Sequence, residues 1–382
     1  MKRETHPPRA DWQQRVESVG LIWHTADGEP YWNEEAHYRF TPAQIAEIEG
    51  ATLAVYELFL KAGQAIVDDP HGLEVFGIPE LFHAAIREAW NAEPPALNFG
   101  RFDFGYDGTG SPKLFEFNCD TPTSLLEAAV VQWAWKEEVF PQLDQFNSIH
   151  ETLIARWREL APHIPDRKLW FAHANDPAGE DTITVSYLRD TAQAGGLTTE
   201  GIVMDDIGWH STTEMFVDLD ERQLRAIFKL YPWEWLANEQ FGQHLVDSLD
   251  RTLWLEPVWK MIWSNKAILP VLWSMFPDHP NLLPAYFSRP EKGDFVQKPI
   301  LAREGANVAI VRDGKRVASS GGDYGAEGYI YQDVYALPET APGVFPVIGS
   351  WIIDGAPVGM GIREDGLITG NKARFVPHVI DA

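Results

Sequence analysis

The chain has 382 residues, of which 45% are hydrophobic and 23% are charged, a balance typical of globular proteins that excludes disordered and fibrous classes. Its formal net charge of −25 disfavours nucleic acid and anionic membranes as partners, and its single cysteine, Cys119, excludes an intramolecular disulfide framework. We see no signal peptide at the N-terminus and no apolar run that reaches the roughly 18 residues needed to span a bilayer, so we expect a cytoplasmic protein.

The first 165 residues are expected to contain both helices and strands. The first helix is expected to begin at Thr41 and Pro42, because threonine caps helices and proline suits their first turn. Residues 97–106 and 113–118 are expected to be strands, and residues 124–139 and 149–160 helices. The apolar surface of the first helix follows helical spacing and comprises Ile45, Ile48, Leu53, Val55, Leu58 and Leu60.

The pattern changes at about residue 166. Residues 169–172 and 199–204 are expected to be strands separated by a helix over residues 184–195, an order that predicts a small α/β unit with parallel pairing. A further helix is expected over residues 238–249.

From about residue 294 the chain is rich in glycine and in strand signals. The dipeptides Asp313-Gly314 and Asp354-Gly355 are typical of hairpin turns. Strands are expected over residues 295–300, 307–312, 329–335, 347–353 and 358–363. We therefore expect a mixed α+β or α/β fold with three parts, namely an N-terminal α+β part (1–165), a small α/β part (166–255) and a β-rich part (256–382).

The strands expected at 97–106 and 113–118 form a hairpin with two different faces, because alternate residues of a strand share a face. The aromatic face carries Phe102, Phe104, Tyr106, Phe115 and Phe117. The polar face carries Arg101, Asp103, Glu116 and Asn118. A turn centred between Thr109 and Gly110 places Asp103 opposite Glu116 and Arg101 opposite Asn118, with roughly 5 Å between the Cβ atoms of each pair.

The polar face of this hairpin predicts a metal site. Two neighbouring carboxylates repel each other and favour a shared cation, and carboxylate and amide oxygens suit Mg²⁺, which keeps waters and substrate phosphates as further ligands. Arg101 would then face the same phosphates. The alternative is a solvated face that carries only salt bridges, and the pattern alone leaves both open.

Two lysines stand in apolar surroundings further along the chain. Lys266 lies in residues 265–270, and Lys298 lies in an expected strand that is followed by a flexible loop at 303–307. Such a lysine and loop can present a point charge and backbone N–H groups to phosphates, although no P-loop or dinucleotide-binding fingerprint is present. The alternative for each lysine is a surface position with a packed stem.

These motifs together resemble the glutathionylspermidine synthetase family of ATP-grasp carboxylate–amine ligases. The matching runs are Arg-Phe-Asp-Phe at 101–104, Glu-Phe-Asn-Cys-Asp-Thr at 116–121, Trp-Glu-Trp at 233–235, Asn-Lys-Ala-Ile-Leu-Pro-Val-Leu-Trp-Ser at 265–274, Lys-Pro-Ile at 298–300 and Tyr-Ile-Tyr-Gln at 329–332. The resemblance implies a permuted ATP-grasp fold, in which the metal ligands precede the nucleotide lysines, with a small α/β substrate subdomain and a β-rich lid. It also implies a stand-alone synthetase without an amidase domain.

The resemblance implies roles for individual residues. Asp103, Glu116 and Asn118 would hold Mg²⁺, as two ions bridged by Glu116, and Arg101 would stabilise the transferred phosphoryl group. ATP would contact Arg101, Phe102, Asp103, Lys266, Lys298, Gly305, Gln332, Arg363, Leu367, Ile368 and Thr369. Candidate contacts to the acid and amine substrates are Thr121, Thr123, Glu180, Asp181 and Glu234. Thr121 and Thr123 replace a serine pair of the family, which leaves the identity of the acid open.

The implied reaction joins a peptide or other carboxylate to an amine or polyamine. The carboxylate attacks the γ-phosphorus of ATP, and the amine then displaces phosphate from the acyl phosphate. A lid would exclude water, and residues 319–328 are its candidate mobile part. Two other functions remain open: a non-catalytic nucleotide-binding module, and a glycoside hydrolase with paired carboxylates, which would give Lys266 and Lys298 no role.

Overall fold

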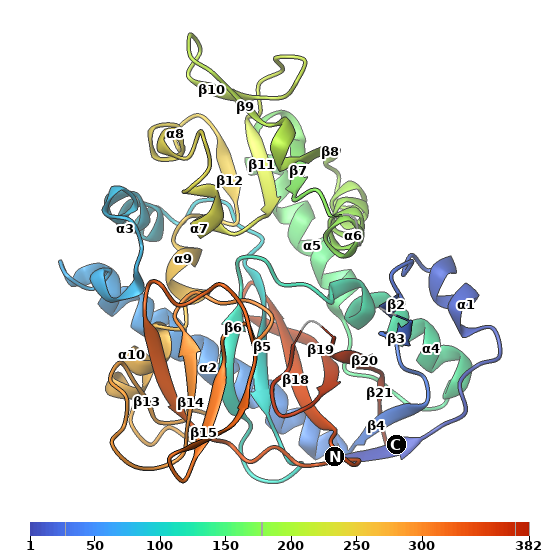
Figure 1. Cartoon of the computed structure of the whole chain (residues 1–382). Coiled ribbons are helices and arrows are strands. Elements are labelled where there is room, and N and C mark those ends of the chain that lie inside the picture. Colours follow the sequence, from blue (N-terminus) through green and yellow to red (C-terminus); the bar gives the residue numbers. More distant parts are fainter. Residues whose placement is uncertain (27, 177–178, 371, 382) are drawn as a thin grey trace.

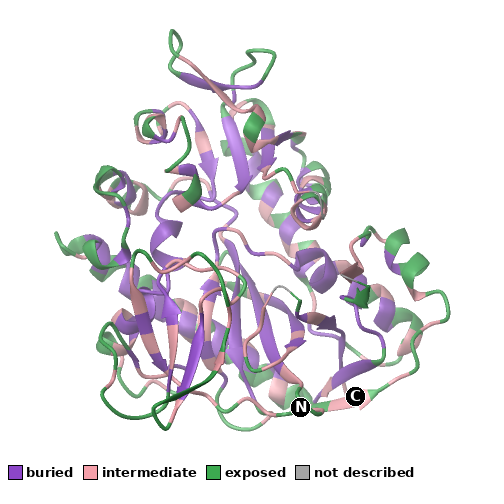
Figure 2. Cartoon of the chain, in the orientation of Figure 1, coloured by how far each residue is buried: buried purple, intermediate pink, exposed green. Residues whose placement is uncertain are grey.

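The computed structural model describes residues 1–26, 28–176, 179–370 and 372–381 and has a mixed α/β fold (Figure 1). Two five-stranded sheets occupy the lower part of the view in Figure 1, and a four-stranded sheet stands above them. Purple strands in Figure 2 show that the centres of all three sheets are buried. The mixed fold that the sequence predicts is confirmed.

The central sheet has the strand order β20-β19-β18-β5-β6, with antiparallel neighbours throughout. It joins the first third of the chain to its last forty residues or so, and it confirms four predicted strands. Its strands are β5 (Phe99–Gly105), β6 (Lys113–Asn118), β18 (Phe345–Ile353), β19 (Ala356–Asp365) and β20 (Arg374–Val376). Asp354 and Gly355 turn the chain between β18 and β19 with positive φ, as their sequence predicts.

Helix α2 (Pro42–Asp68) contacts β18 and β19, and begins where the sequence predicts. The Thr41 hydroxyl accepts a hydrogen bond from the Gln44 backbone, and the Gln44 side chain caps Thr41 in return. The predicted apolar surface was too wide. Leu53 and Leu60 are 45% and 42% exposed, because they lie on the side of the helix away from the buried row that contains Ile48 and Val55.

The second five-stranded sheet has the order β13-β17-β14-β15-β16, and α10 (Ile268–Met275) contacts β13 and β17. The strands predicted at 295–300, 307–312 and 329–335 are confirmed, and Asp313-Gly314 forms the turn between β15 and β16. The strands are β13 (Ala285–Tyr286), β14 (Phe295–Pro299), β15 (Ala309–Arg312), β16 (Lys315–Ser319) and β17 (Tyr329–Asp333).

The four-stranded sheet is parallel, with the order β12-β11-β7-β8, and it confirms the predicted strand–helix–strand unit. Its strands are β7 (Lys168–His173), β8 (Thr198–Val203), β11 (Ala226–Leu230) and β12 (Leu253–Leu255). Helix α6 (Glu180–Ala194) connects β7 to β8 and packs against α5 (Ile149–Leu160). A small hairpin of β9 (Gly208–His210) and β10 (Met215–Val217) protrudes beyond this sheet (Figure 1).

The helix predicted over residues 238–249 is shorter in the structure. Part of it forms α8 (Gln243–Asp247), which is separate from the preceding α7 (Trp233–Leu236). A Cβ atom at Gly242 would lie 2.4 Å from the carbonyl oxygen of Ala237, so the chain between the two helices leaves no room for a side chain there.

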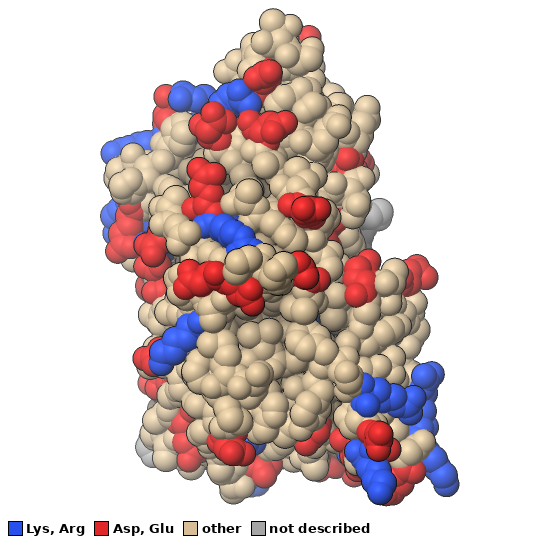
Figure 3. Space-filling view, turned by 90° about the vertical axis from the view of Figure 1, so that its left-hand side faces the viewer, with Lys and Arg blue, Asp and Glu red and all other residues tan. Residues whose placement is uncertain are grey.

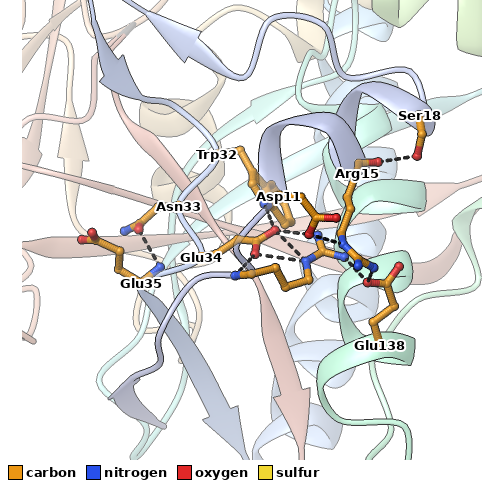
Figure 4. A network of polar contacts seen from close by, with 9 residues as sticks. Asp11, Arg15, Ser18, Trp32, Asn33, Glu34, Glu35 and Glu138 are labelled. Atoms are coloured by element: carbon orange, nitrogen blue, oxygen red, sulfur yellow. Dashed lines mark hydrogen bonds and ion pairs between the residues drawn. The ribbon is translucent and has the colours of Figure 1, made fainter.

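Both ends of the chain meet in a three-stranded sheet, in which β4 (Ala36–Phe40) lies between β1 (Lys2–Thr5) and β21 (His378–Ile380). Nearby, Arg9 pairs with buried Glu34 at 2.6 Å and with Glu138 of α4 (Gln132–Val139) at 2.7 Å. Figure 4 shows this network, in which Arg15 of α1 (Trp12–Ser18) also contacts Glu138. These ion pairs connect the N-terminal segment to Glu34 and to α4.

The remaining described elements are short or peripheral. They are β2 (Thr25–Ala26), β3 (Glu29–Pro30), α3 (His83–Ala92), α9 (Lys260–Trp263), a π-helical turn (Glu127–Val131) at the start of α4, and 3-10 turns at Glu74–Phe76, Glu80–Phe82, Ala161–His163, Pro165–Arg167 and Met204–Asp206. The helices predicted at 124–139 and 149–160 are confirmed. On the face shown in Figure 3, acidic side chains form a band across the middle, while much of the lower half carries no charge.

Candidate active site

The hairpin of β5 and β6 has the predicted register, with Asp103 opposite Glu116 and Arg101 opposite Asn118. A bulge between Asp103 and Phe104 then shifts the pairing, so that Leu114 lies opposite Phe104.

One part of the aromatic-face prediction is therefore wrong. Phe102 and Phe117 stack in the core with 3.8 Å between ring centroids, but Phe115 lines a cavity, 6.1 Å from the ring of Tyr335. The bulge explains why Phe115 leaves the packed face that Phe117 occupies.

The polar face gathers the three predicted metal ligands. Asp103 accepts hydrogen bonds from Arg101 Nε at 2.7 Å and from Arg363 Nη2 at 2.6 Å. The Asn118 amide donates to Asp103 at 3.2 Å and to Glu116 at 3.3 Å. Arg363 comes from β19, so the hairpin receives a second guanidinium from a distant part of the chain.

Both predicted lysines converge on this hairpin. Lys266 Nζ lies 2.9 Å from Glu116 Oε2 and donates to the Ala302 carbonyl at 2.7 Å. Lys298 Nζ donates to the Phe115 carbonyl at 3.0 Å and to Gln332 Oε1 at 2.7 Å. Each lysine is only 8% exposed, so neither is the surface residue that the alternative interpretation assumed.

Burial and charge act together on the ionisable groups of the site. Burial alone would raise the pKa of Glu116, but the charges of Lys266 and Lys298 outweigh it and hold that pKa below its usual range. Burial lowers the pKa of Lys298 to about 8, although the charge of Glu116 opposes the shift. Across the described residues Lys298 forms no ion pair with a carboxylate, so its ammonium is the buried cation most in need of an anion.

The hairpin and lysines line a cavity of about 560 Å³. Fifteen of the predicted site residues line it, and they are Arg101, Asp103, Glu116, Asn118, Thr121, Thr123, Glu234, Lys266, Lys298, Gly305, Gln332, Arg363, Leu367, Ile368 and Thr369. This volume suits a nucleotide-sized ligand. The structure thus brings together residues from the two five-stranded sheets, from the loops around them and from α7.

Three predicted site residues do not line this cavity. The Phe102 ring is buried in the core. Glu180 and Asp181 begin α6 beside the cavity, where Thr123 hydrogen-bonds Glu180 and the charge of Arg303 acts on Asp181. Burial raises the pKa of Asp181 to about 6.

The cavity is also lined by residues that were not among the sequence-based candidates, and Arg303 and Asp120 have informative contacts. Arg303 contacts the Thr121 hydroxyl and lies over the Trp235 ring, 5.6 Å from its centroid. The sequence feature that could have identified Arg303 as a site residue is its position in the loop that follows Lys298. Asp120 also lines the cavity. It lies inside the recognised 116–121 run, but no local sequence pattern predicts that it pairs with Lys229 of β11.

A loop containing Gly305 closes one side of the cavity. Gly305 has φ +67°, and a Cβ atom there would lie 2.6 Å from the Thr369 carbonyl oxygen. The Asn307 side chain donates to the Tyr324 carbonyl, and the backbone N–H of Asn307 donates to the Gly321 carbonyl at 3.1 Å. The loop at 303–307 is therefore packed between residues 367–369 and the glycine-rich segment 319–328.

The residues present fit a divalent cation held together with phosphates. Across the described ranges no three His, Cys, Asp or Glu side chains gather to hold a metal on their own. The two carboxylates of Asp103 and Glu116 lie beside the Asn118 amide, whose NH2 group donates to both of them. Rotation of that amide would turn its oxygen toward the carboxylates, and the resulting partial set of oxygen ligands suits Mg²⁺ because that ion takes its other ligands from water and phosphate. No helix in the described part of the chain is long and apolar enough to cross a membrane.

The whole fold is similar to that of a glutathione synthetase-like effector from Globodera pallida, with a TM-score of 0.59, 10% identity and 98% of both chains covered. This likeness concerns the fold alone and agrees with the mixed α/β architecture described above. The model of the family described as glutathionylspermidine synthase preATP-grasp matches residues 3–381, and the chain belongs to that family. The resemblance first seen in its motifs is thereby confirmed.

Named relatives agree with this assignment. A Haemophilus influenzae protein that is provisionally named an acid–amine ligase is 41% identical over 396 residues, which cover 99% of each chain. Trypanothione synthetase of Crithidia fasciculata is 30% identical over 353 residues, which cover 84% of this chain and 53% of the relative. The chain thus spans about half the length of that second relative. The family and its named members place this chain among the ATP-dependent acid–amine ligases.

Proposed function

We propose that this protein uses ATP to join a small carboxylate, such as that of a peptide, to an amine or polyamine. The observation that carries the proposal is the convergence of Lys266 and Lys298 on the carboxylate-bearing hairpin inside one cavity. We further propose a permuted ATP-grasp arrangement, with the sheet of β13 to β17 as the lid and residues 166–255 as the substrate part, between parts 1–165 and 256–382.

ATP would lie between the two five-stranded sheets. Lys298 would bind its phosphates, because a buried ammonium without a carboxylate partner gains most from an anion, and Lys266 would join it by exchanging Glu116 for a phosphate. Gln332 holds Lys298 and donates its amide to the Leu114 carbonyl at 3.0 Å, which supports a role in placing that lysine near the base and phosphates. The remaining proposed ATP contacts are Arg101, Phe102 through its backbone, Asp103, Gly305, Arg363, Leu367, Ile368 and Thr369.

Asp103, Glu116 and Asn118 would hold Mg²⁺, and we propose two ions. Bound Mg²⁺ would supply neutralisation of the phosphate charge. In the structure these carboxylates already neutralise Arg101, Arg363 and Lys266. Binding of Mg-ATP would therefore exchange partners, with the cationic side chains turning from carboxylates to phosphates.

The reaction needs charge neutralisation and exclusion of water more than covalent catalysis by the protein. The substrate carboxylate attacks the γ-phosphorus, which releases ADP and leaves an acyl phosphate, and the amine then attacks the acyl carbon and releases phosphate. Arg101 would stabilise charge on the transferred phosphoryl group. The loop at 303–307 and the segment 319–328 would shield the acyl phosphate from water.

The acid and amine would bind at the part of the cavity that carries Thr121, Thr123 and Glu234, with Glu180 and Asp181 beside it. Burial raises the pKa values of Glu180 and Glu234, so these carboxyl groups gain from a cationic partner. A positively charged amine meets that requirement. This chemistry supports an amine or polyamine without choosing among them.

The test measures ADP release from Mg-ATP in the presence of paired acids and amines, beginning with glutathione and spermidine, and identifies the product by mass spectrometry. We expect ADP release that requires both substrates and a product mass equal to the acid plus the amine minus water. Mg-ATP binding without substrate-dependent ADP release across a broad screen would instead indicate a non-catalytic nucleotide-binding module. Failure to bind Mg-ATP would refute the proposal.

A further inference from the structure

The ammonium group of Lys229 is buried at the end of β11 that faces the hairpin. The side chain of Lys229 is 0% exposed and pairs with the Asp120 carboxylate, which is 4% exposed. Its Nζ also donates to the Tyr231 carbonyl at 3.0 Å and lies 4.7 Å from the centroid of the Trp233 ring. This lysine does not line the cavity, so it has no direct route to a substrate there.

Asp120 joins three parts of the fold at one carboxylate. It follows the end of β6 by two residues, and one of its oxygens binds Lys229 of β11. The other oxygen accepts a hydrogen bond from the Trp233 backbone N–H at 2.9 Å, at the first residue of α7. A single side chain thus connects the hairpin, the parallel sheet and a short helix, and Figure 1 shows these elements meeting between the upper and central sheets.

Helix α7 carries a cavity-lining group directly after this anchor. The buried Trp233 is held a second time by its indole N–H, which donates to the Glu256 carbonyl at 3.1 Å. The next residue, Glu234, lines the cavity. On the hairpin side, the residue after Asp120 is Thr121, which also lines it. Thr121 therefore follows Asp120 directly, and Glu234 follows Trp233, whose backbone N–H is bound by the same carboxylate.

We propose that Lys229 is a positioning residue that, through Asp120, fixes Glu234 and Thr121 relative to the metal-binding hairpin. The inference rests on the proposed function, because it assigns these two side chains to the acid or amine. The Lys229 ammonium also neutralises the Asp120 carboxylate. Asp120 therefore orients its neighbours and does not itself bind the cationic amine.

The chain contains a matched control. Lys136 of α4 has the same three kinds of partner, since it pairs with Glu137, donates to the Leu143 carbonyl at 3.3 Å and lies 4.0 Å from the Trp133 ring centroid. Its side chain is 4% exposed, and it does not line the cavity. Lys136→Met therefore removes a comparably buried ammonium with no connection to the proposed substrate contacts.

The experiment compares Lys229→Met, Asp120→Asn, the double variant and Lys136→Met with the wild type. It measures thermal unfolding, the Kd of Mg-ATP by calorimetry, and KM and kcat for glutathione and spermidine from ADP release. It also measures backbone hydrogen exchange over residues 233–236. The double variant leaves no unpaired buried charge, so it keeps the test usable if Lys229→Met folds poorly.

We expect Lys229→Met and the double variant to raise KM for glutathione or spermidine about tenfold, as a displaced positioning group does, and to speed exchange over residues 233–236. The Kd of Mg-ATP should stay within about twofold, because neither side chain contacts the lysines or carboxylates proposed to bind it. Lys136→Met should lower the unfolding temperature without changing either KM.

Unchanged KM values in both Lys229→Met and the double variant would overturn the proposal, as would equal KM effects from Lys136→Met. If the wild type releases no ADP with any acid and amine, the proposed function fails. Hydrogen exchange then tests only whether the Lys229–Asp120 ion pair anchors α7. In that case, unchanged exchange over residues 233–236 in Lys229→Met would overturn the positioning role as well. Faster exchange would support the claim that the ion pair anchors α7, and only the claim that this anchoring affects substrate binding would be refuted.

Discussion

Removing the ammonium of Lys298 should weaken ATP binding by an amount that can be worked out from its contacts. Among the residues that the structure describes, the partners of the Lys298 ammonium are the Phe115 carbonyl, the Gln332 amide oxygen and the Phe115 ring. A hydrogen bond to a charged group contributes about 1.5–3 kcal/mol, which corresponds to a roughly ten- to hundredfold change in Kd. We expect Lys298→Met to raise the Kd of Mg-ATP by that factor.

The pH dependence of the same binding step tests the cause. Burial lowers the pKa of Lys298 to about 8, so the group is charged below that pH and neutral above it. The Kd of Mg-ATP should therefore rise roughly tenfold per pH unit above pH 8 in the wild type. In Lys298→Met this dependence should disappear, and in Lys298→Arg it should shift beyond the measurable range because a guanidinium stays charged.

Isothermal calorimetry between pH 6.5 and about pH 9.5 measures both effects, with Lys315→Met as the control. Lys315 begins β16 of the same sheet, is exposed and does not line the cavity, so its removal changes the net charge equally. A Kd for Lys298→Met that equals that of Lys315→Met would refute the phosphate-binding role. A wild-type Kd that is flat across pH 8 would refute the assignment of the titration to Lys298.

Three further predictions concern other parts of the molecule. Glu116→Gln should abolish Mg²⁺-dependent ADP release while circular dichroism stays unchanged, because the Glu116 side chain is 27% exposed and is not part of the core; near-normal kcat would contradict its role as a ligand. Gly305→Val should raise the KM for ATP in ADP-release assays, because its Cβ would meet the Thr369 carbonyl and its φ is +67°; an unchanged KM would mean that the loop does not cover the nucleotide. Burial raises the pKa of Glu127 to about 7 from 4.5, so its favourable protonated state is fully present below pH 4.5 and is lost as pH rises through 7. Glu127→Gln should therefore lose less stability between pH 5 and pH 8 than the wild type does, and equal changes in unfolding temperature would contradict this.

The hairpin could be predicted from the sequence because its signal is local. Alternation along residues 101–106 and 113–118 fixed which side chains share a face, and the turn fixed the register that pairs Asp103 with Glu116. The bulge after Asp103 could not be predicted, because it depends on how Leu114 and Phe115 pack against the neighbouring sheet. Its effect was to move Phe115 from the core to the cavity.

The long-range contacts of the site could not be derived from local patterns. The Arg363–Asp103 pair joins β19 and β5 of the central sheet, and the Lys298–Gln332 bond joins the neighbouring strands β14 and β17, so both depend on which distant segments of the chain come together in one sheet. The motif resemblance supplied the candidate residues but not their partners. The Lys229–Asp120 pair shows the same limit, since nothing in either local sequence predicts that a lysine of β11 meets the end of β6. Helical periodicity likewise did not show that only residues 243–247 of the predicted stretch would form a helix.

The order of strands in the central sheet has a consequence for synthesis on the ribosome. The hairpin of β5 and β6 emerges early, but its neighbour β18 is translated only near the end of the chain, and β21 later still pairs with β4. The β5 edge of the nascent hairpin therefore remains unpaired while most of the polypeptide is synthesised, and during that time it can bind chaperones or aggregate. A nascent chain stalled before β18 should accordingly remain sensitive to proteases around residues 99–118.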